Sequence, residues 1–188
     1  VKNGRTLSAA NVADTWIGFE AEATHAFASL PITQDVGNLE GKELRFGTAA
    51  GPLWSVVTTS TSNGSVNAMH DSLNPLAGMM PMIGMWLNED FGGVGVGMVN
   101  MFMYIIVGVF IAGMMIGRTP EYLGWRVEAK EVKFAMMGLL SHGFFILVGT
   151  AIFAVTPWGA ATLNNIGPHG FSEILYEFTS AAANNGSG

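Results

Sequence analysis

The triplet Asn-Gly-Ser occurs twice in this chain, at residues 63–65 and again at residues 185–187, a spacing of 122 residues. Each copy follows a short stretch rich in Ser, Thr and Ala, which is typical of a helix of about three turns that stops at a turn. The central glycine permits backbone angles that are closed to other residues, so successive carbonyl oxygens can face one axis. Carbonyl oxygens arranged in this way can replace the hydration shell of an ion. The paired triplets therefore predict a cation site built from backbone.

The composition of the triplets indicates which cation would suit them. Neither triplet contains Asp or Glu, whereas calcium and magnesium sites normally recruit carboxylates, so potassium is favoured over divalent ions. The negative dipole ends of two short helices would add to the attraction for a cation. The alternative is purely structural, because one Asn-Gly-Ser triplet is also an ordinary turn that ends a helix. The repetition of the same triplet after the same kind of helix favours the site.

Two apolar runs lie between the triplets and are long enough to cross a membrane. Residues 91–117 carry no charge and, at about 1.5 Å per residue, outspan a hydrocarbon core of roughly 30 Å. Residues 134–155 form the second run, in which His142 is the one ionisable side chain. With 12% charged residues and a mean hydropathy of +0.38, the chain is too apolar for an ordinary soluble domain. We expect an all-α membrane protein.

Two features inside these runs admit two interpretations each. Four glycines between residues 92 and 97 predict either a broken entry into the first span or a close contact between helices. His142 predicts a neutral imidazole that is hydrogen-bonded to a neighbouring helix, with a proton relay as the alternative.

The segment between the two runs, residues 118–133, holds four of the eight Lys and Arg residues. A short loop with this many cations is expected in the cytoplasm. The triplets would then lie on the outer side, at the ends of two apolar stretches, residues 46–61 and 170–183, that are too short to span and are expected to be re-entrant. Irregular backbone at that depth is tolerated only where protein buries it or where it lines a water-filled cavity.

Composition also excludes several kinds of function. The chain has no cysteine, which excludes disulfides and thiolate chemistry, and its four histidines show no metal-ligand spacing. Lys and Arg are outnumbered by Asp and Glu, 8 to 14, so nucleic-acid binding is not expected. The chain has neither a GxxxxGKS/T loop nor a DKTG motif, so we expect no catalytic site, and energy from ATP would have to come from another chain.

Longer motifs resemble one known family, the potassium-binding subunit of the bacterial ATP-driven potassium transporter, KdpA. The motifs that carry this resemblance are GNLEGKELRFG (37–47), TTSTSNGSVNAMHDS (58–72), FGGVGVG (91–97), FIAGMMIGRTPEYLG (110–124), GPHGFSE (167–173) and TSAAANNGSG (179–188). They are long, ordered and specific, and the resemblance covers about four fifths of the chain. Residues 1–36 match nothing recognisable and are expected to be a lineage-specific external loop.

The resemblance implies a membrane pore of pseudo-fourfold, potassium-channel-like repeats, each a helix, a pore loop and a second helix, of which only about half would be present in this internal fragment. Its parts would be an external loop region at 1–45, the third pore loop and the following broken transmembrane helix at 46–117, a cytoplasmic loop at 118–133, a transmembrane helix at 134–156, and an external loop with the fourth pore loop at 157–188.

The resemblance also implies that two stretches of backbone form a potassium-binding filter reached from outside. The residues of this filter would be Thr61, Ser62, Asn63, Gly64 and Ser65 in the third pore loop, and Asn184, Asn185 and Gly186 in the fourth. Potassium would be the transported ion, and no organic cofactor is implied. This chain departs from the family pattern at two places. Asn63 stands where the family has a Cys, and Trp125 and Arg126 stand where it has a paired Lys.

Two residues outside the filter are further candidates. Arg118 closes the first apolar run and could obstruct cations at the inner end of the pore as a gate, which the family resemblance supports. The alternative is a positive anchor among the lipid headgroups. Asp71 follows the third filter segment and could concentrate cations in the outer vestibule. Its alternative is the cap of the next helix.

The resemblance implies a non-catalytic subunit that binds and translocates potassium within an ATP-driven, P-type uptake complex in the bacterial plasma (inner) membrane, which it would cross several times. Its partners would be the ATP-hydrolysing P-type subunit, small accessory membrane subunits and the lipid bilayer. A gradient-driven potassium channel or transporter of the same pore superfamily is the alternative. A non-conducting scaffold is a third interpretation.

Overall fold

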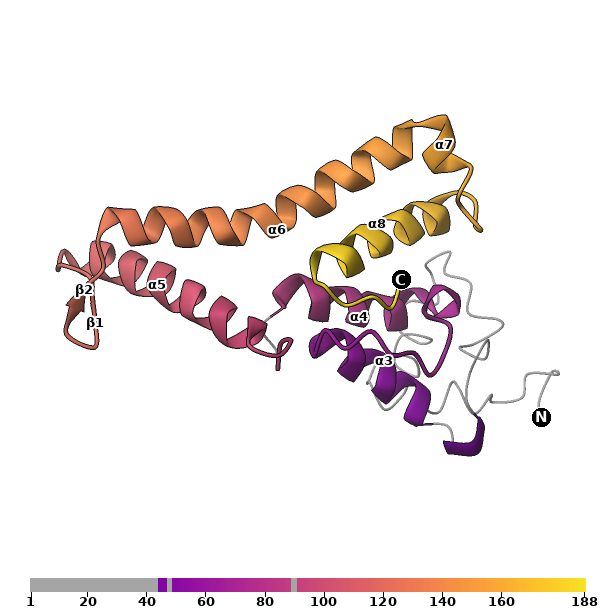
Figure 1. Ribbon diagram of the computed structural model, residues 1–188, viewed down its shortest axis with the longest axis horizontal. Coiled ribbons are helices and arrows are strands. Elements are labelled where there is room, and N and C mark those ends of the chain that lie inside the picture. The colour runs from indigo at the N-terminus through magenta and orange to yellow at the C-terminus, as the bar shows by residue number, and fades with distance from the viewer. Residues whose placement is uncertain (1–43, 47–48, 89–90) are drawn as a thin grey trace, which may run out of the picture. The chain divides into compact units, whose positions relative to one another are not determined.

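The computed structural model describes residues 44–46, 49–88 and 91–188, and these residues are mostly helical (Figure 1). The external loop region predicted for residues 1–45 lies outside the described residues, apart from the 3-10 helix η2 (Leu44–Phe46). The chain divides into two compact units. The first comprises Val1–Leu87 together with Thr179–Gly188, and the second comprises Asn88–Phe178.

Helices α3 (Ala50–Ser60) and α4 (Pro75–Leu87) pack against each other in the first unit, with the 3-10 helix η3 (His70–Ser72) between them in the chain. The buried residues of α3 are small or carry hydroxyls, which lets α4 approach closely. A Cβ added at Gly84 of α4 would meet the Ser60 hydroxyl at 3.0 Å. The buried hydroxyls of Ser55 and Thr59 donate to carbonyls one turn earlier, so they cost little to bury.

The first unit also contains the last turn of α8 (Pro168–Ala182) and the residues that follow it. Within this unit the indole N–H of Trp86 on α4 donates to the Thr179 hydroxyl over 3.1 Å. Thr179 is fully buried, and this hydrogen bond connects the end of α8 to α4.

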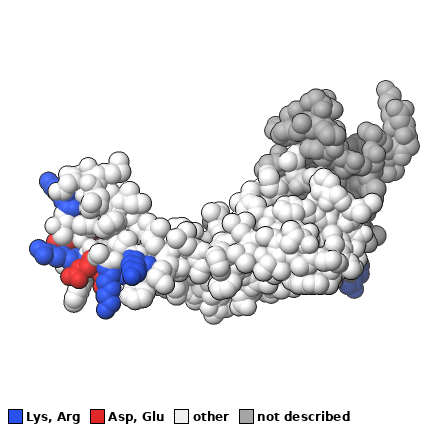
Figure 2. All heavy atoms as spheres, turned by 90° about the horizontal axis from the view of Figure 1, so that it is seen from above, with Lys and Arg blue, Asp and Glu red and all other residues white. Residues whose placement is uncertain are grey.

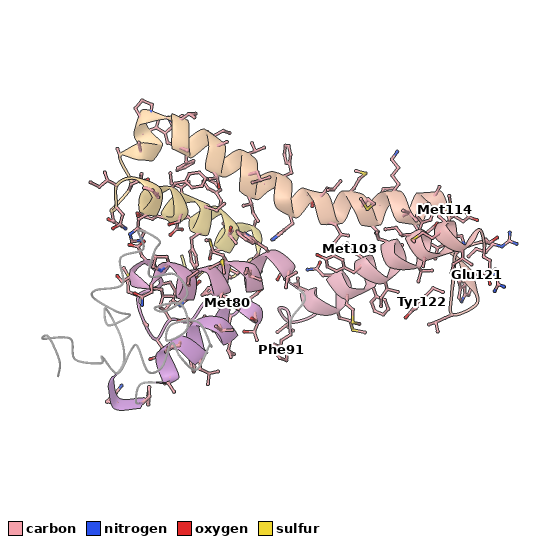
Figure 3. The ribbon with its side chains drawn as sticks, turned by 180° about the vertical axis from the view of Figure 1, so that it is seen from behind. Met80, Phe91, Met103, Met114, Glu121 and Tyr122 are labelled. Carbon is pink, nitrogen blue, oxygen red and sulfur yellow. The ribbon has the colours of Figure 1, made fainter. Side chains whose placement is uncertain are left out.

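In the second unit, α5 (Val96–Ile116) and α6 (Ala129–Val155) pack against each other, and both are long and apolar enough to cross a membrane. They approach closely at a glycine, because a Cβ added at Gly138 of α6 would lie 2.7 Å from the Met103 sulfur of α5. Figure 3 labels Met103 on α5. The expected pair of helices with the length and apolar character needed to span a membrane is thus present. The short helix α7 (Pro157–Ala160) and most of α8 complete this unit.

A two-residue β-hairpin connects α5 to α6. Strand β1 (Glu121–Tyr122) pairs antiparallel with β2 (Trp125–Arg126). The two loop residues, Leu123 and Gly124, both have positive φ, as the turns that suit a tight hairpin require. Charged side chains gather over this end of the unit, as Figure 2 shows.

Helix α6 begins at Ala129, inside the segment that was predicted to be a loop, and it ends at Val155. The earlier start has a local cause. Glu128 and Glu131 form a capping box, in which each side chain accepts a hydrogen bond from the backbone N–H of the other residue. The helix therefore extends one turn beyond the apolar run.

The glycine-rich segment before α5 is not helical. Helix α4 ends at Leu87 and α5 begins at Val96, while Gly92 and Gly95 have φ of +54° and +83°. Asn100, the polar side chain of this run, donates from Nδ2 to the Asn88 carbonyl over 2.8 Å. Of the two interpretations of the glycines, the structure therefore has the broken entry.

His142 lies partly buried in α6, and its Nε2 is buried without a hydrogen-bond partner among the described residues. The hydrogen bond to a neighbouring helix that the sequence suggested is therefore not present in this part of the chain.

Candidate cation-binding site

Helix α3 ends in a Schellman motif directly before the first triplet. The backbone N–H of Asn63 donates to the Thr58 carbonyl over 2.9 Å, and that of Ser62 donates to the Thr59 carbonyl over 3.4 Å. This motif needs a left-handed residue after the helix, and Ser62 has a φ of 52°. The helix therefore ends at a fixed place, and the chain turns sharply into the triplet.

Helix α8 ends in the same motif 122 residues later. The N–H of Asn185 donates to the Ser180 carbonyl over 2.9 Å, and that of Asn184 donates to the Ala181 carbonyl over 3.1 Å. Asn184 is the left-handed residue, with a φ of 55°. The sequence repeat is therefore also a structural repeat, residue for residue.

The triplets that follow the two helices have the same turn. In each, the Asn side-chain oxygen accepts a hydrogen bond from the N–H of the following Ser, at 3.0 Å for Asn63 and 2.9 Å for Asn185. Gly64 and Gly186 then adopt φ of +82° and +88°, a region that side chains disfavour. The central glycines predicted from the sequence are used for their conformational freedom at both positions.

The two triplets lie in contact within the first unit. The Asn185 side chain donates from Nδ2 to the Thr58 carbonyl over 2.8 Å. A Cβ added at Gly64 would collide with the Asn185 carbonyl oxygen. The structure therefore brings together the two groups of predicted filter residues, although more than a hundred residues separate them in the chain.

Two further side chains fix the triplets, and neither was anticipated from the sequence. The indole N–H of Trp54 on α3 donates to both the carbonyl and the hydroxyl oxygen of Ser65, each over 3.1 Å. The Ser180 hydroxyl of α8 accepts hydrogen bonds from the N–H groups of Gly186, at 3.0 Å, and Gly188, at 3.3 Å. The only sequence signal was a Trp among small residues, one helix length before a triplet.

The other candidate residues lie outside the triplets. Thr61 caps α3, and its hydroxyl donates to the Val57 carbonyl over 2.7 Å. Asp71 is partly buried in η3, in the same unit as the triplets, beside His70, whose pKa is lowered by burial. Arg118 is exposed directly after Gly117, the C-cap of α5, and belongs to the second unit.

The start of α8 is held by a carboxylate. Glu173 accepts hydrogen bonds from the backbone N–H and the side-chain amide of both Asn164 and Asn165, at 3.0 to 3.2 Å. Burial raises the pKa of Glu173, but these four hydrogen bonds outweigh that effect, so its pKa lies below the ordinary value. The ionised carboxylate thereby fixes the loop that leads into α8.

We expect the contribution of Glu173 to depend on pH. Because its folded pKa is depressed, the stabilisation is complete above the pKa of the unfolded carboxyl and is lost as the pH falls through the folded pKa. Thermal unfolding of the complete subunit should show Glu173→Gln less stable than wild type at neutral pH, with the difference closing in acid. Glu121→Gln, which removes an exposed pair with Arg126 at 4.0 Å, is the control and should show little difference. A stability difference for Glu173→Gln that does not change with pH would contradict a stabilising role for the ionised carboxylate.

The chemistry available at the triplets is that of backbone oxygens. No group of three His, Asp or Glu side chains in the described ranges could hold a metal ion. The carbonyls of Thr58 and Ser180 already accept cap hydrogen bonds, so the oxygens that can turn toward an ion are those farther along each segment. Such an arrangement suits a weakly hydrated monovalent cation.

Comparison with known proteins gives one consistent result. Residues 2–188 match the KdpA family, described as Potassium-transporting ATPase A subunit. The chain is similar to proteins named potassium-transporting ATPase potassium-binding subunit. Three of these are from Phocaeicola vulgatus, 58% identical over 84% of the chain, Rhodospirillum centenum, 51% over 96%, and Pseudomonas aeruginosa, 54% over 89%.

The extent of these matches corrects the prediction for residues 1–36 and shows how much of the relatives' length this chain covers. The family match begins at residue 2, so the prediction that residues 1–36 are specific to one lineage was wrong. Those residues lack a motif distinctive enough to be recognised by inspection. The chain spans about a third of the length of these relatives, with shares of 29%, 32% and 30%.

Proposed function

This chain belongs to the KdpA family of potassium-transporting ATPase A subunits, and we propose that its two Asn-Gly-Ser segments form the third and fourth parts of a potassium filter. The observation that carries this proposal is the repeat itself. Two segments 122 residues apart share the same helix cap, the same Asn turn and the same positive glycine φ, and they lie in contact.

In the proposed mechanism, potassium enters from outside and exchanges its hydration water for backbone oxygens of Thr61–Ser65 and Asn184–Gly186. The caps hold these segments rigid, so the oxygens are already in place when the ion arrives. The negative dipole ends of α3 and α8 favour a cation at that point. No carboxylate is required, because a monovalent ion needs less compensating charge than calcium or magnesium.

The proposed setting is a multi-pass protein of the bacterial inner membrane with pseudo-fourfold pore repeats. Helices α5 and α6 would cross the bilayer, and the β1–β2 hairpin with its charged neighbours would lie in the cytoplasm. An ATP-hydrolysing P-type subunit and small accessory membrane subunits would complete the complex, since the chain has no nucleotide-binding motif. Support for the ATPase partner comes from the relatives, which are named as subunits of a potassium-transporting ATPase.

Two residues have proposed roles around the filter. Arg118, at the charged end of α5, would act as a gate or as a headgroup anchor. Asp71, in the unit that holds the filter segments, would raise the local cation concentration at the outer entrance.

The proposed function is tested with the complete subunit, purified with its ATPase partner and reconstituted in vesicles. We expect ATP hydrolysis and ion uptake to rise with external potassium and to respond far less to sodium. Uptake that proceeds down a gradient without ATP would favour the gradient-driven alternative. A complex with no preference for potassium would contradict the filter.

Trp54→Phe should weaken potassium binding moderately. The substitution keeps an aromatic ring and removes the N–H that holds Ser65, a loss of about 1 kcal/mol for one hydrogen bond, or about a fivefold higher potassium concentration for half-maximal ATP hydrolysis. Trp158→Phe is the matched control, because Trp158 packs edge-on against Phe153 in the second unit, away from the triplets in sequence. Equal rises in the half-maximal potassium concentration for both variants would contradict a role for the Trp54–Ser65 hydrogen bond in potassium binding.

A further inference from the structure

The two triplets have the same backbone turn, but their Asn side chains have different surroundings. Asn63 is exposed, whereas Asn185 is buried with 5% of its surface accessible. The difference arises because Asn185 points into the contact between the end of α8 and the end of α3. A family comparison of triplet sequences alone would treat the two residues as equivalent.

The Asn185 side chain makes hydrogen bonds in three directions. Its Nδ2 donates to the Thr58 carbonyl over 2.8 Å, and its Oδ1 accepts from the Ser187 N–H over 2.9 Å and from the Ser180 hydroxyl over 3.4 Å. The Ser187 N–H can only donate and the Thr58 carbonyl can only accept, so the orientation of the amide is determined. A carboxylate at this position could accept from the Ser187 N–H but could not donate to the Thr58 carbonyl.

The same residue also limits how closely the two segments approach. The Asn185 carbonyl oxygen lies where a Cβ of Gly64 would be, so the backbones meet with no side chain between them. The Asn185 side-chain amide donates to the Thr58 carbonyl, which also accepts the cap hydrogen bond of α3. The backbone carbonyl of Asn185 lies against Gly64 of the other triplet. Asn185 therefore supplies both the hydrogen bond that connects the two segments and the backbone contact that sets their spacing.

We propose that Asn185 is a positioning residue whose side-chain amide fixes the distance between the third and fourth filter segments and thereby determines which monovalent cation the filter accepts. The inference rests on the proposed function, since it assigns a role within the same filter. A filter of backbone oxygens selects ions through the number and placement of those oxygens. A tie that holds two of its segments together thus affects selectivity before it affects transport rate.

The repeat supplies matched variants for the test. Asn185→Asp and Asn63→Asp add the same charge and keep the same Asn-type turn, but only the first removes the donor to the Thr58 carbonyl. Asn185→Ala and Asn63→Ala form a second, uncharged pair that differs in the same way. All four are made in the complete subunit with its ATPase partner, and ATP hydrolysis is measured against potassium and against sodium.

We expect both Asn185 variants to raise the potassium concentration for half-maximal ATP hydrolysis by about tenfold or more, with the maximal rate within about twofold of wild type. The preference for potassium over sodium should fall by a similar factor. Each Asn63 variant, which loses only a local turn or gains only a charge, should shift both quantities less than its partner.

Two results would overturn the inference while leaving the proposed function intact. One is an equal shift for the Asn185 and Asn63 variants in both pairs. The other is a lower maximal rate for Asn185 variants with the preference for potassium unchanged, which would indicate a role in stability alone. The proposed function itself fails separately, when the wild-type complex shows no preference for potassium.

Discussion

Gly64→Ala is expected to abolish potassium-stimulated ATP hydrolysis at potassium concentrations that saturate the wild-type complex. A φ of +82° costs a residue with a side chain about 1–2 kcal/mol. In addition, the new Cβ collides with the Asn185 carbonyl oxygen, which belongs to the backbone and cannot rotate away. The two filter segments must therefore separate, and we expect the half-maximal potassium concentration to rise more than about a hundredfold, since each 1.4 kcal/mol is a factor of ten.

Gly186→Ala provides the matched comparison. Gly186 has nearly the same φ, +88°, but no described atom lies within 4 Å of an added Cβ. Its cost is the backbone strain alone, so we expect about a tenfold rise in the half-maximal potassium concentration. The measurement is a potassium titration of ATP hydrolysis, with the thermal stability of the complex recorded beside it. Equal losses in the two variants would show that the collision at Gly64 does not matter.

The sequence predicted the parts of the site that repeat. Residues 46–61 and 170–183 were expected to be short helices that stop before each triplet, and α3 and α8 end at Ser60 and Ala182. This prediction succeeded because the signal that ends each helix is local: a helix of small residues rarely continues through Asn and Gly. The glycines were also expected to adopt backbone angles that other residues disfavour, and Gly64 and Gly186 have φ of +82° and +88°.

What the sequence could not predict depends on neighbours that are distant in the chain. Asn63 and Asn185 occupy the same position in identical triplets, yet only Asn185 is buried, because α3 lies against it. The hydrogen bond from Trp54 to Ser65 requires the chain after α3 to fold back toward the middle of that helix, which no periodicity in the sequence reveals. The start of α6 was missed for a different reason. Residues 118–133 are highly charged and were predicted to be a loop, but Glu128 and Glu131 form a capping box that starts the helix at Ala129.

Gly92→Ala is expected to destabilise the second unit strongly. Gly92 has a φ of +54°, and an added Cβ would collide with the Cα of Gly97 in the first turn of α5. Left-handed strain of about 1–2 kcal/mol and overpacking of about 1–3 kcal/mol both apply, so we expect a loss of about 3 kcal/mol. Thermal unfolding of the purified complete subunit in detergent measures it.

Gly108→Ala is the control for this prediction, because Gly108 lies in the interior of α5 and no described atom lies within 4 Å of an added Cβ. Ala is favoured over Gly inside a helix by about 0.5–1 kcal/mol, so this variant should be at least as stable as wild type. Two Gly→Ala changes sixteen residues apart should therefore act in opposite directions. If both were neutral, α5 could begin without the tight turn between Phe91 and Gly97, and the break before the helix would not depend on its glycines.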